Sequence, residues 1–124
     1  MTDPEAFTDR YIAVWNEPDA EARRAQIAAL WTEDGVHLSP NHEARGYDAL
    51  EARVRGAYEK FVAEGGYIFR RHGAADGHHG VVRFKWEMVP AGGGPIEAVG
   101  SDVFVFSPDG RLSADYQFAE PTPV

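Results

Sequence analysis

Val81-Val-Arg-Phe-Lys-Trp-Glu-Met88 alternates apolar and polar side chains, with Val82, Phe84, Trp86 and Met88 at every second position. Because successive side chains of a β-strand point to opposite faces, this pattern predicts a strand with one buried face. The neighbouring segments predict further strands at residues 67–73, 96–106 and 112–118, with turns at 76–77 and 107–110. We therefore expect the second half of the chain to form a sheet of hairpin-linked strands.

The first half of the chain has a different period, because its apolar residues recur every three or four positions, as is typical of helices. Three helices are expected to begin at Asp3-Pro4, at Asp19 and after Gly46. The second should end at Asp34-Gly35, before a short extended stretch over residues 36–39, and the third at Gly65-Gly66.

Three helices followed by hairpin-linked strands predict one α+β domain with the helices packed into a strongly curved antiparallel sheet. The concave side of such a sheet leaves an apolar cavity, which is the usual form of a small-ligand site.

The composition limits the partners of this domain. The chain has 124 residues, a usual length for one domain, and a net charge of −8, which argues against nucleic acids and anionic membranes. It has no cysteine, so disulfides, thiol nucleophiles and thiolate metal sites are excluded. No apolar run reaches 18 residues, and the first residues lack the features of a signal peptide. We expect a cytoplasmic protein.

Several segments resemble nuclear-transport-factor-2-like proteins, a superfamily that includes ketosteroid isomerase and the SnoaL-like polyketide cyclases. The segments that carry the likeness are Arg10-Tyr-Ile-Ala-Val-Trp-Asn16, residues 29–40, Arg45-Gly-Tyr-Asp-Ala-Leu50 and Ser101-Asp-Val-Phe-Val-Phe106. The likeness implies a single SnoaL-like domain over residues 1–124, built as a cone-shaped α+β barrel of the cystatin-like type. It does not imply a reaction, since one fold hosts many functions.

The resemblance also implies catalytic positions. Tyr11 lies where ketosteroid isomerase has its oxyanion-hole tyrosine, and Asp102 lies where it has an aspartic acid that stays protonated and donates a hydrogen bond. Ser39 stands where that enzyme has its aspartate base, so steroid isomerisation is not expected. His37, two residues earlier on the same side of an extended segment, is the candidate replacement base.

Further residues are expected to bind a ligand at the pocket wall: Trp15, Ser39, Phe84, Trp86, Phe104 and Tyr116. Core packing is the alternative role for Tyr11 and the tryptophans, and a structural ion pair is the alternative for Asp102. No metal-binding or phosphate-binding motif occurs, so we expect neither a metal nor a cofactor.

Two kinds of function fit these features. One is an isomerase, cyclase or dehydratase that acts on a small apolar carbonyl compound through Tyr11, His37 and Asp102. The other is a non-catalytic domain that binds a hydrophobic ligand or serves as a dimeric interaction module. In both cases we expect a small hydrophobic molecule as ligand and a homodimer formed through the sheet.

Overall fold

The computed structural model describes residues 3–122 and confirms the α+β class. The helices are α1 (Pro4–Trp15), α2 (Ala20–Leu30) and α3 (Tyr47–Ala57), and α3 continues into a π-helical segment, η1 (Tyr58–Glu64). The strands are β1 (Trp31–Ser39), β2 (His42–Arg45), β3 (Tyr67–Arg71), β4 (Asp76–His78), β5 (Val81–Pro90), β6 (Ala98–Phe106) and β7 (Leu112–Glu120). None of the helices in this part of the chain is long and apolar enough to cross a membrane.

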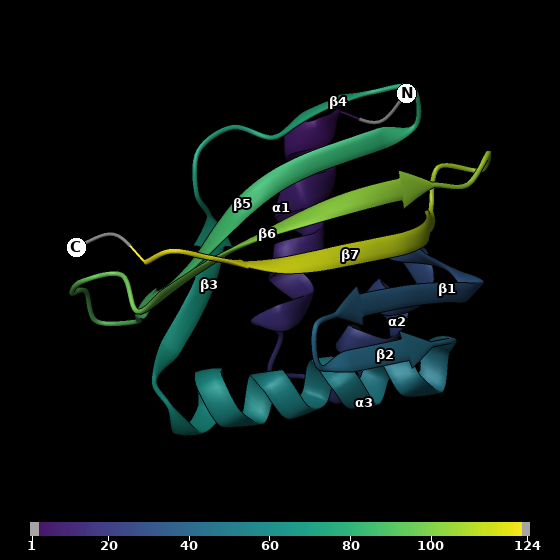
Figure 1. The fold of residues 1–124 in the computed structure, drawn as a ribbon. Coiled ribbons are helices and arrows are strands. Elements are labelled where there is room, and N and C mark those ends of the chain that lie inside the picture. Colours follow the sequence, from purple (N-terminus) through teal and green to yellow (C-terminus); the bar gives the residue numbers. More distant parts are fainter. Residues whose placement is uncertain (1–2, 123–124) are drawn as a thin grey trace.

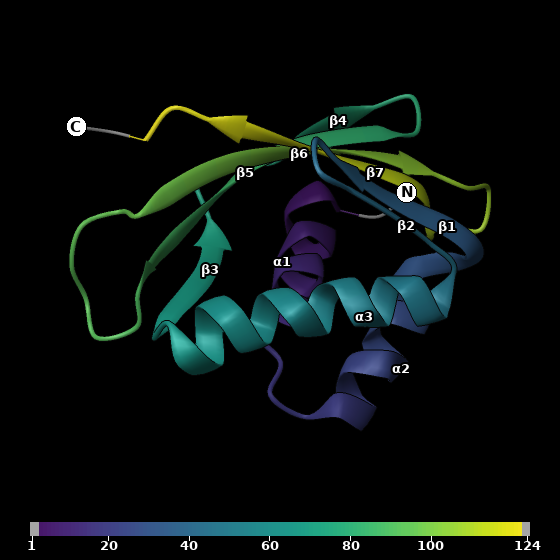
Figure 2. The ribbon, with the colours of Figure 1, turned by 60° about the horizontal axis from the view of Figure 1, so that its bottom comes forward.

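The seven strands form one curved sheet in the order β2-β1-β7-β6-β5-β3, with β4 paired to β5 (Figure 1). Its pairs are antiparallel except that β1 and β7 run parallel, so the sheet is mixed. In Figure 2 the sheet arches over α1, while α3 and α2 lie below it and close the concave side. This arrangement places one face of each central strand against the helices.

Two helix starts form as the sequence predicts. The Asp3 carboxylate accepts from the Glu5 amide at 3.1 Å, and the Asp19 carboxylate accepts from the Ala22 amide at 2.9 Å. Each aspartate satisfies a backbone N–H that has no partner within its own helix.

The second helix is shorter than predicted, because the chain turns into β1 at Trp31 rather than after Gly35. Trp31 is fully buried, and its carbonyl accepts a hydrogen bond from the Tyr47 hydroxyl at 2.9 Å, which holds the extended backbone there. The tight turn after Ser39 returns the chain as β2, a strand that the sequence analysis did not predict.

Asp76-Gly77 forms part of β4 rather than the predicted turn. Gly77 lies opposite Val82 in the sheet, and a Cβ there would approach the Val82 Cγ2 to 2.5 Å. The glycine is needed for this close approach, whereas the chain reverses at His79 and Gly80, where φ is positive.

The core lies between α1 and the concave face of the sheet. Phe7, Tyr11 and the inward residues of β5 and β6 form an aromatic cluster in which the Tyr11 ring centre lies 4.7 Å from that of Phe104 and 5.8 Å from that of Phe84. Asn16, at the end of α1, fixes this helix to β3: its amide donates to the Phe69 carbonyl at 2.7 Å, and its oxygen accepts from the Phe69 amide at 2.9 Å. These contacts hold Tyr11 against the sheet.

Candidate functional site

Tyr11, His37 and Asp102 come together on the concave face of the sheet, although they are far apart in the sequence. Tyr11 reaches the sheet from α1, His37 lies on β1 and Asp102 on β6. A fourth residue, Asp115 on β7, lies between them, because the parallel register pairs His37 with Asp115. All four side chains are buried.

Asp115 was not predicted, because the alternation of β7 suggested that Tyr116 faces inward. The structure shows the reverse. β6 pairs Phe106 with Leu112 but Val105 with Ala114, so β7 carries one extra residue at Ser113. Such a bulge exchanges the two faces of the strand beyond it. Leu112 and Asp115 are therefore both buried, while Tyr116 lies on the outer face.

Hydrogen bonds connect the four residues. The Tyr11 hydroxyl is in contact with Asp115 Oδ2 and lies 3.2 Å from Asp102 Oδ2. His37 Nδ1 lies 2.7 Å from the same Asp115 oxygen. On the other side, Trp86 Nε1 donates to Asp102 Oδ1 at 2.8 Å. The network therefore runs from Trp86 at one end to His37 at the other.

Burial favours the protonated form of Asp102. Desolvation raises the pKa of this carboxyl group well above its usual value, and the neighbouring Asp115 raises it further. Burial likewise raises the pKa of the Tyr11 phenol, and the two carboxyl groups add to this effect. A protonated Asp102 can donate to the Tyr11 oxygen while Tyr11 donates to Asp115, so every proton in this part of the network has an acceptor.

His37 and Asp115 form the second half of the network. Burial raises the pKa of Asp115 to about 6, so the group is mainly ionised at neutral pH. Burial lowers the pKa of His37 to about 4, which favours the neutral imidazole. A neutral His37 that donates through Nδ1 to the carboxylate must leave Nε2 as an acceptor, and this atom has no partner within the described chain.

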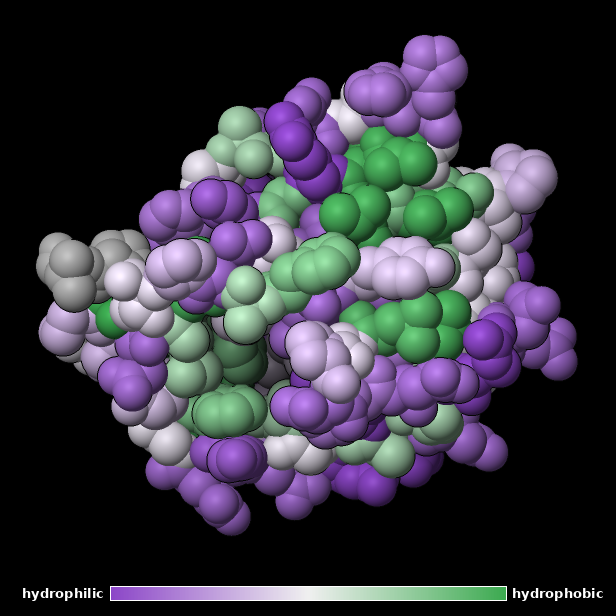
Figure 3. Space-filling view, viewed as in Figure 1, coloured by the Kyte–Doolittle hydropathy of each residue, from purple (hydrophilic) through white to green (hydrophobic). Residues whose placement is uncertain are grey.

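A cavity of about 460 Å³, its open mouth included, lies beside Tyr11 and Asp102. Its wall is mainly apolar and consists of Tyr11, Ile12, Trp15, Arg53, Ala57, Phe61, Phe69, Trp86, Asp102 and Gln117. It shares several of these residues with a wider groove, which appears in Figure 3 as a hollow between β7 and α3. A concave, mainly apolar wall with a few polar groups is the usual form of a small-ligand site.

The residues predicted as ligand contacts have three different positions. Trp15 and Trp86 line the cavity, and Ser39 lines the outer groove, where its hydroxyl lies 3.2 Å from His42 Nδ1. The structure does not bring the other three to the cavity wall. Phe84 and Phe104 lie behind Tyr11 in the core, and Tyr116, 41% exposed, lies on the outer face of the sheet because of the bulge in β7.

His37 also lies behind the cavity wall rather than in it. Its ring centre is 5.3 Å from that of Trp15, which does line the cavity. Direct contact between His37 and a ligand would therefore require the Trp15 side chain to shift.

The same groups offer a donor set to a metal ion, since donor atoms of His37, Asp102 and Asp115 lie within 4.8 Å of one another. Two of the groups are already bonded to each other through His37 Nδ1 and Asp115 Oδ2. An ion that used these atoms would have to replace that hydrogen bond.

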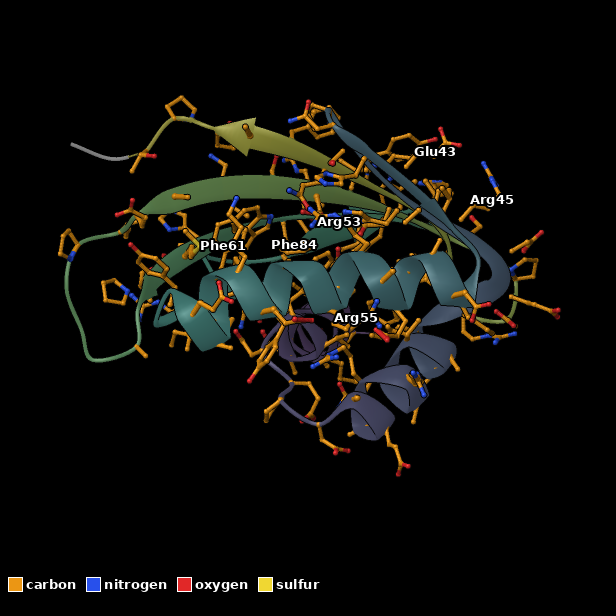
Figure 4. All side chains as sticks on the ribbon, turned by 90° about the horizontal axis from the view of Figure 1, so that it is seen from below. Glu43, Arg45, Arg53, Arg55, Phe61 and Phe84 are labelled. Atoms are coloured by element: carbon orange, nitrogen blue, oxygen red, sulfur yellow. The ribbon has the colours of Figure 1, made fainter. Side chains whose placement is uncertain are left out.

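Arg53 is a cavity residue that the sequence analysis missed. It lies three positions after Leu50 and four before Ala57, so it shares the inward face of α3 with these buried residues. Figure 4 shows Arg53 directed from α3 towards the sheet. An arginine within a predicted apolar stripe was the signal that could have identified it.

Comparisons with known proteins agree with this architecture. The family model of the SnoaL-like domain matches residues 8–114. A solved structure from Agrobacterium tumefaciens, of the SnoaL-like family and with a suggested isomerase activity, is 30% identical, with a TM-score of 0.88 over 98% of this chain and 100% of that one. No curated protein sequence matches the chain.

More distant structures share the fold. An NTF2-like protein with a cystatin-like fold from Novosphingobium aromaticivorans is 22% identical, with a TM-score of 0.70 over 92% of this chain and 77% of that one. A protein from Sinorhizobium meliloti with a suggested polyketide cyclase activity is 13% identical, with a TM-score of 0.64 over 90% of this chain and 93% of that one. The match over most of its length and the likeness to the Agrobacterium protein show that this chain belongs to the SnoaL-like family.

Proposed function

We propose that this protein catalyses acid–base chemistry of the isomerase, cyclase or dehydratase type on a small, mainly apolar carbonyl compound. The observation that carries the proposal is the position of Asp102, a buried carboxyl group with a raised pKa, next to the Tyr11 hydroxyl at an apolar cavity wall. A carboxyl group that keeps its proton near neutral pH can donate a hydrogen bond to a carbonyl oxygen.

In this mechanism Asp102 and Tyr11 release the hydrogen bonds that they donate to Tyr11 and Asp115, and both donate to the substrate carbonyl oxygen instead. These bonds stabilise the negative charge that develops on the oxygen when a proton leaves the adjacent carbon. The proposed acceptor of that proton is His37 Nε2, and Asp115 holds the imidazole in the tautomer that leaves this nitrogen free. Trp15 would have to move aside to let His37 reach the substrate.

Proton exchange at a model ketone tests the proposal without knowledge of the natural substrate. We expect the wild-type protein to accelerate exchange of the α-protons of 2-tetralone in D₂O, followed by proton NMR, above the rate in buffer at equal pH. Asp102→Leu, which has a similar size but no hydrogen-bond donor, should lower the protein-dependent rate about 10²–10³-fold, as removal of an oxyanion donor does in other enzymes. Asp34→Asn, at an exposed residue of β1, is the control and should leave the rate unchanged.

Two results would contradict the proposal: a wild-type rate equal to that of buffer, or an unchanged rate in Asp102→Leu. Binding of 2-tetralone without exchange would support the second candidate, a domain that binds a hydrophobic ligand without converting it. That candidate is favoured by the position of His37 behind the cavity wall.

We also propose that the protein forms a homodimer through the outer face of the sheet and acts in the cytoplasm. Val81, Tyr116 and Phe118 are large hydrophobic residues that are 39–50% exposed, and the strand register places them on the face opposite to Asp102 and Asp115. A second copy would cover them. Sedimentation should give twice the chain mass of 13.7 kDa. A Tyr116→Lys, Phe118→Lys variant should sediment as a monomer, whereas Glu43→Lys on β2 should not, and a monomeric wild type would refute the dimer.

A further inference from the structure

Arg53 is the one residue of the cavity wall that carries a full positive charge at neutral pH, because the guanidinium group does not deprotonate in proteins. Within residues 3–122 it has no carboxylate partner, and its Nε, closed off from solvent, has no hydrogen-bond acceptor. An arginine that is more than half buried without a partner is costly to maintain, unless it meets its counter-charge in a bound state.

The other arginines near the site differ in this respect. Arg55, two residues further along α3, pairs with Glu51 at 2.6 Å and points away from the sheet in Figure 4. On β3, Arg70 pairs with Glu87 at 2.7 Å and Arg71 with Asp9 at 2.9 Å. The sequence motif Arg70-Arg71 is therefore already engaged, and among the described residues that line the cavity Arg53 is the cation available to a ligand.

A second donor lies beside Arg53. Its guanidinium carbon lies 5.3 Å from the centre of the Trp15 ring, so the side chain is held against the indole. Trp15 Nε1 is also closed off from solvent and has no acceptor within the described residues. Both side chains line the cavity, so an oxyanion there could accept hydrogen bonds from both after small side-chain adjustments.

The carboxyl groups of the site do not neutralise Arg53. Asp115 lies behind the wall and is already bonded to Tyr11 and His37, while Asp102 is bonded to Trp86 and favours its protonated form. Burial lowers the pKa of Arg53, and both carboxyl groups act in the opposite direction through space. Neither forms an ion pair with Arg53.

We infer that the natural ligand is an apolar carbonyl compound that also bears a carboxylate, and that Arg53 with Trp15 binds this carboxylate. The inference rests on the proposed function for the carbonyl end, which Asp102 and Tyr11 bind. It adds a specificity-determining residue on α3 for the other end. The apolar wall made by Phe61, Phe69 and Trp86 then contacts the carbon skeleton between the two polar ends.

A matched pair of probes tests the anion site directly. 2-Naphthoate and 2-naphthamide have nearly the same shape, but only the first is charged. By isothermal titration calorimetry at low salt, we expect the wild-type protein to bind 2-naphthoate at least ten-fold more tightly than 2-naphthamide. Arg53→Gln should reduce this ratio to about one, Arg53→Lys should keep part of it, and Arg55→Gln should leave it unchanged.

A measurement on the wild-type protein covers the case in which the Arg53→Gln variant fails to fold. The Arg53 Nε–H resonance should move downfield on addition of 2-naphthoate and stay in place with 2-naphthamide. A wild-type affinity ratio near one, an unchanged ratio in Arg53→Gln, failure of both probes to bind, or an unmoved Arg53 resonance would overturn the inference.

The outcomes for the two proposals are separate. A preference for 2-naphthoate without exchange of 2-tetralone protons would retain the anion site and reject the catalytic role. Exchange of the 2-tetralone protons without a preference for 2-naphthoate would retain the catalytic role and reject the anion site.

Discussion

Replacement of Asp102 by asparagine tests the protonation state on which the proposed chemistry depends. Asparagine has the shape of a protonated aspartic acid: its oxygen can accept from Trp86 Nε1, as Asp102 Oδ1 does at 2.8 Å, and its amide can donate to the Tyr11 oxygen. If the buried carboxyl group is protonated, the variant keeps these hydrogen bonds and folds normally. If the group were ionised, asparagine would remove a charge around which the network is built.

The sign of the pH dependence follows from the direction of the pKa shift. The unfolded chain releases the Asp102 proton near pH 4, whereas the folded protein holds it to higher pH because burial raises the pKa. Between these two pKa values the folded state binds more protons, so the Asp102 contribution to stability falls as pH rises. For one proton the fall is about 1.4 kcal/mol per pH unit.

Urea unfolding at pH 5, 6 and 7 measures this contribution. We expect the free energy of unfolding of Asp102→Asn, minus that of the wild type, to increase from pH 5 to pH 6, by at most about 1.4 kcal/mol for one proton. His37 and Asp115 are present in both proteins, so their own titrations cancel to first order. A constant difference, or one that decreases with pH, would refute the assignment of Asp102 as a protonated acid.

Asp109→Asn is the matched control. Its hydrogen bonds to Ser107 and Arg111 lower the pKa of Asp109 to about 2, so the group is ionised in both folded and unfolded states above pH 5. Its stability contribution is therefore complete in this range, and the difference between this variant and the wild type should not change between pH 5 and pH 7.

Two further variants test how the site is held in place. Gly100→Ala places a Cβ 2.2 Å from Trp86 Cζ2, so the indole must move, and thermal unfolding should show a loss of about 1–3 kcal/mol. Gly56→Ala, in α3 with nothing within 4 Å of the added Cβ, should instead gain about 0.5–1 kcal/mol; equal effects of the two would contradict this account. Asn16→Ala removes two hydrogen bonds to Phe69 and should cost about 1–3 kcal/mol and speed hydrogen exchange at the Phe69 amide, whereas unchanged exchange would show that α1 is fixed by other contacts.

The sequence predicted most of the fold because its local signals agree with the tertiary structure. The alternation over residues 81–88 does bury Val82, Phe84 and Met88, and the caps Asp3 and Asp19 do begin helices. Tyr11 and Asp102, named from the resemblance, and His37, named from its spacing to Ser39, lie in one hydrogen-bond network through Asp115, and their catalytic role stays a prediction. The sequence therefore predicted the orientation of those side chains that follow the regular period of their own helix or strand.

The sequence could not predict features that depend on contacts between elements. The bulge at Ser113 exists only as a mismatch between β6 and β7, so the alternation within β7 alone gave the wrong face to Asp115 and Tyr116. The end of α2 at Leu30 likewise depends on the distant Tyr47, which holds Trp31 extended. The local sequence pattern of β7 or of α2 contains no information about these distant contacts.

Arg53 connects the ligand to the base of the proposed reaction. Its positive charge is one of the causes that lower the pKa of His37, after burial. A carboxylate bound beside Arg53 would offset this charge, so His37 should become more basic when an anionic ligand is present. Because binding and protonation are linked, protonation of His37 must in turn strengthen anion binding.

NMR titration of the His37 imidazole can measure this coupling. We expect its pKa, about 4 in the free protein, to rise in the presence of 2-naphthoate and to change less with 2-naphthamide. In Arg53→Gln the free pKa should already be higher, and the difference between the two probes should disappear. A His37 pKa that stays the same with both probes would show that the anion site and the base act independently, whereas the expected shift would mean that the substrate's carboxylate helps to prepare the base that takes its proton.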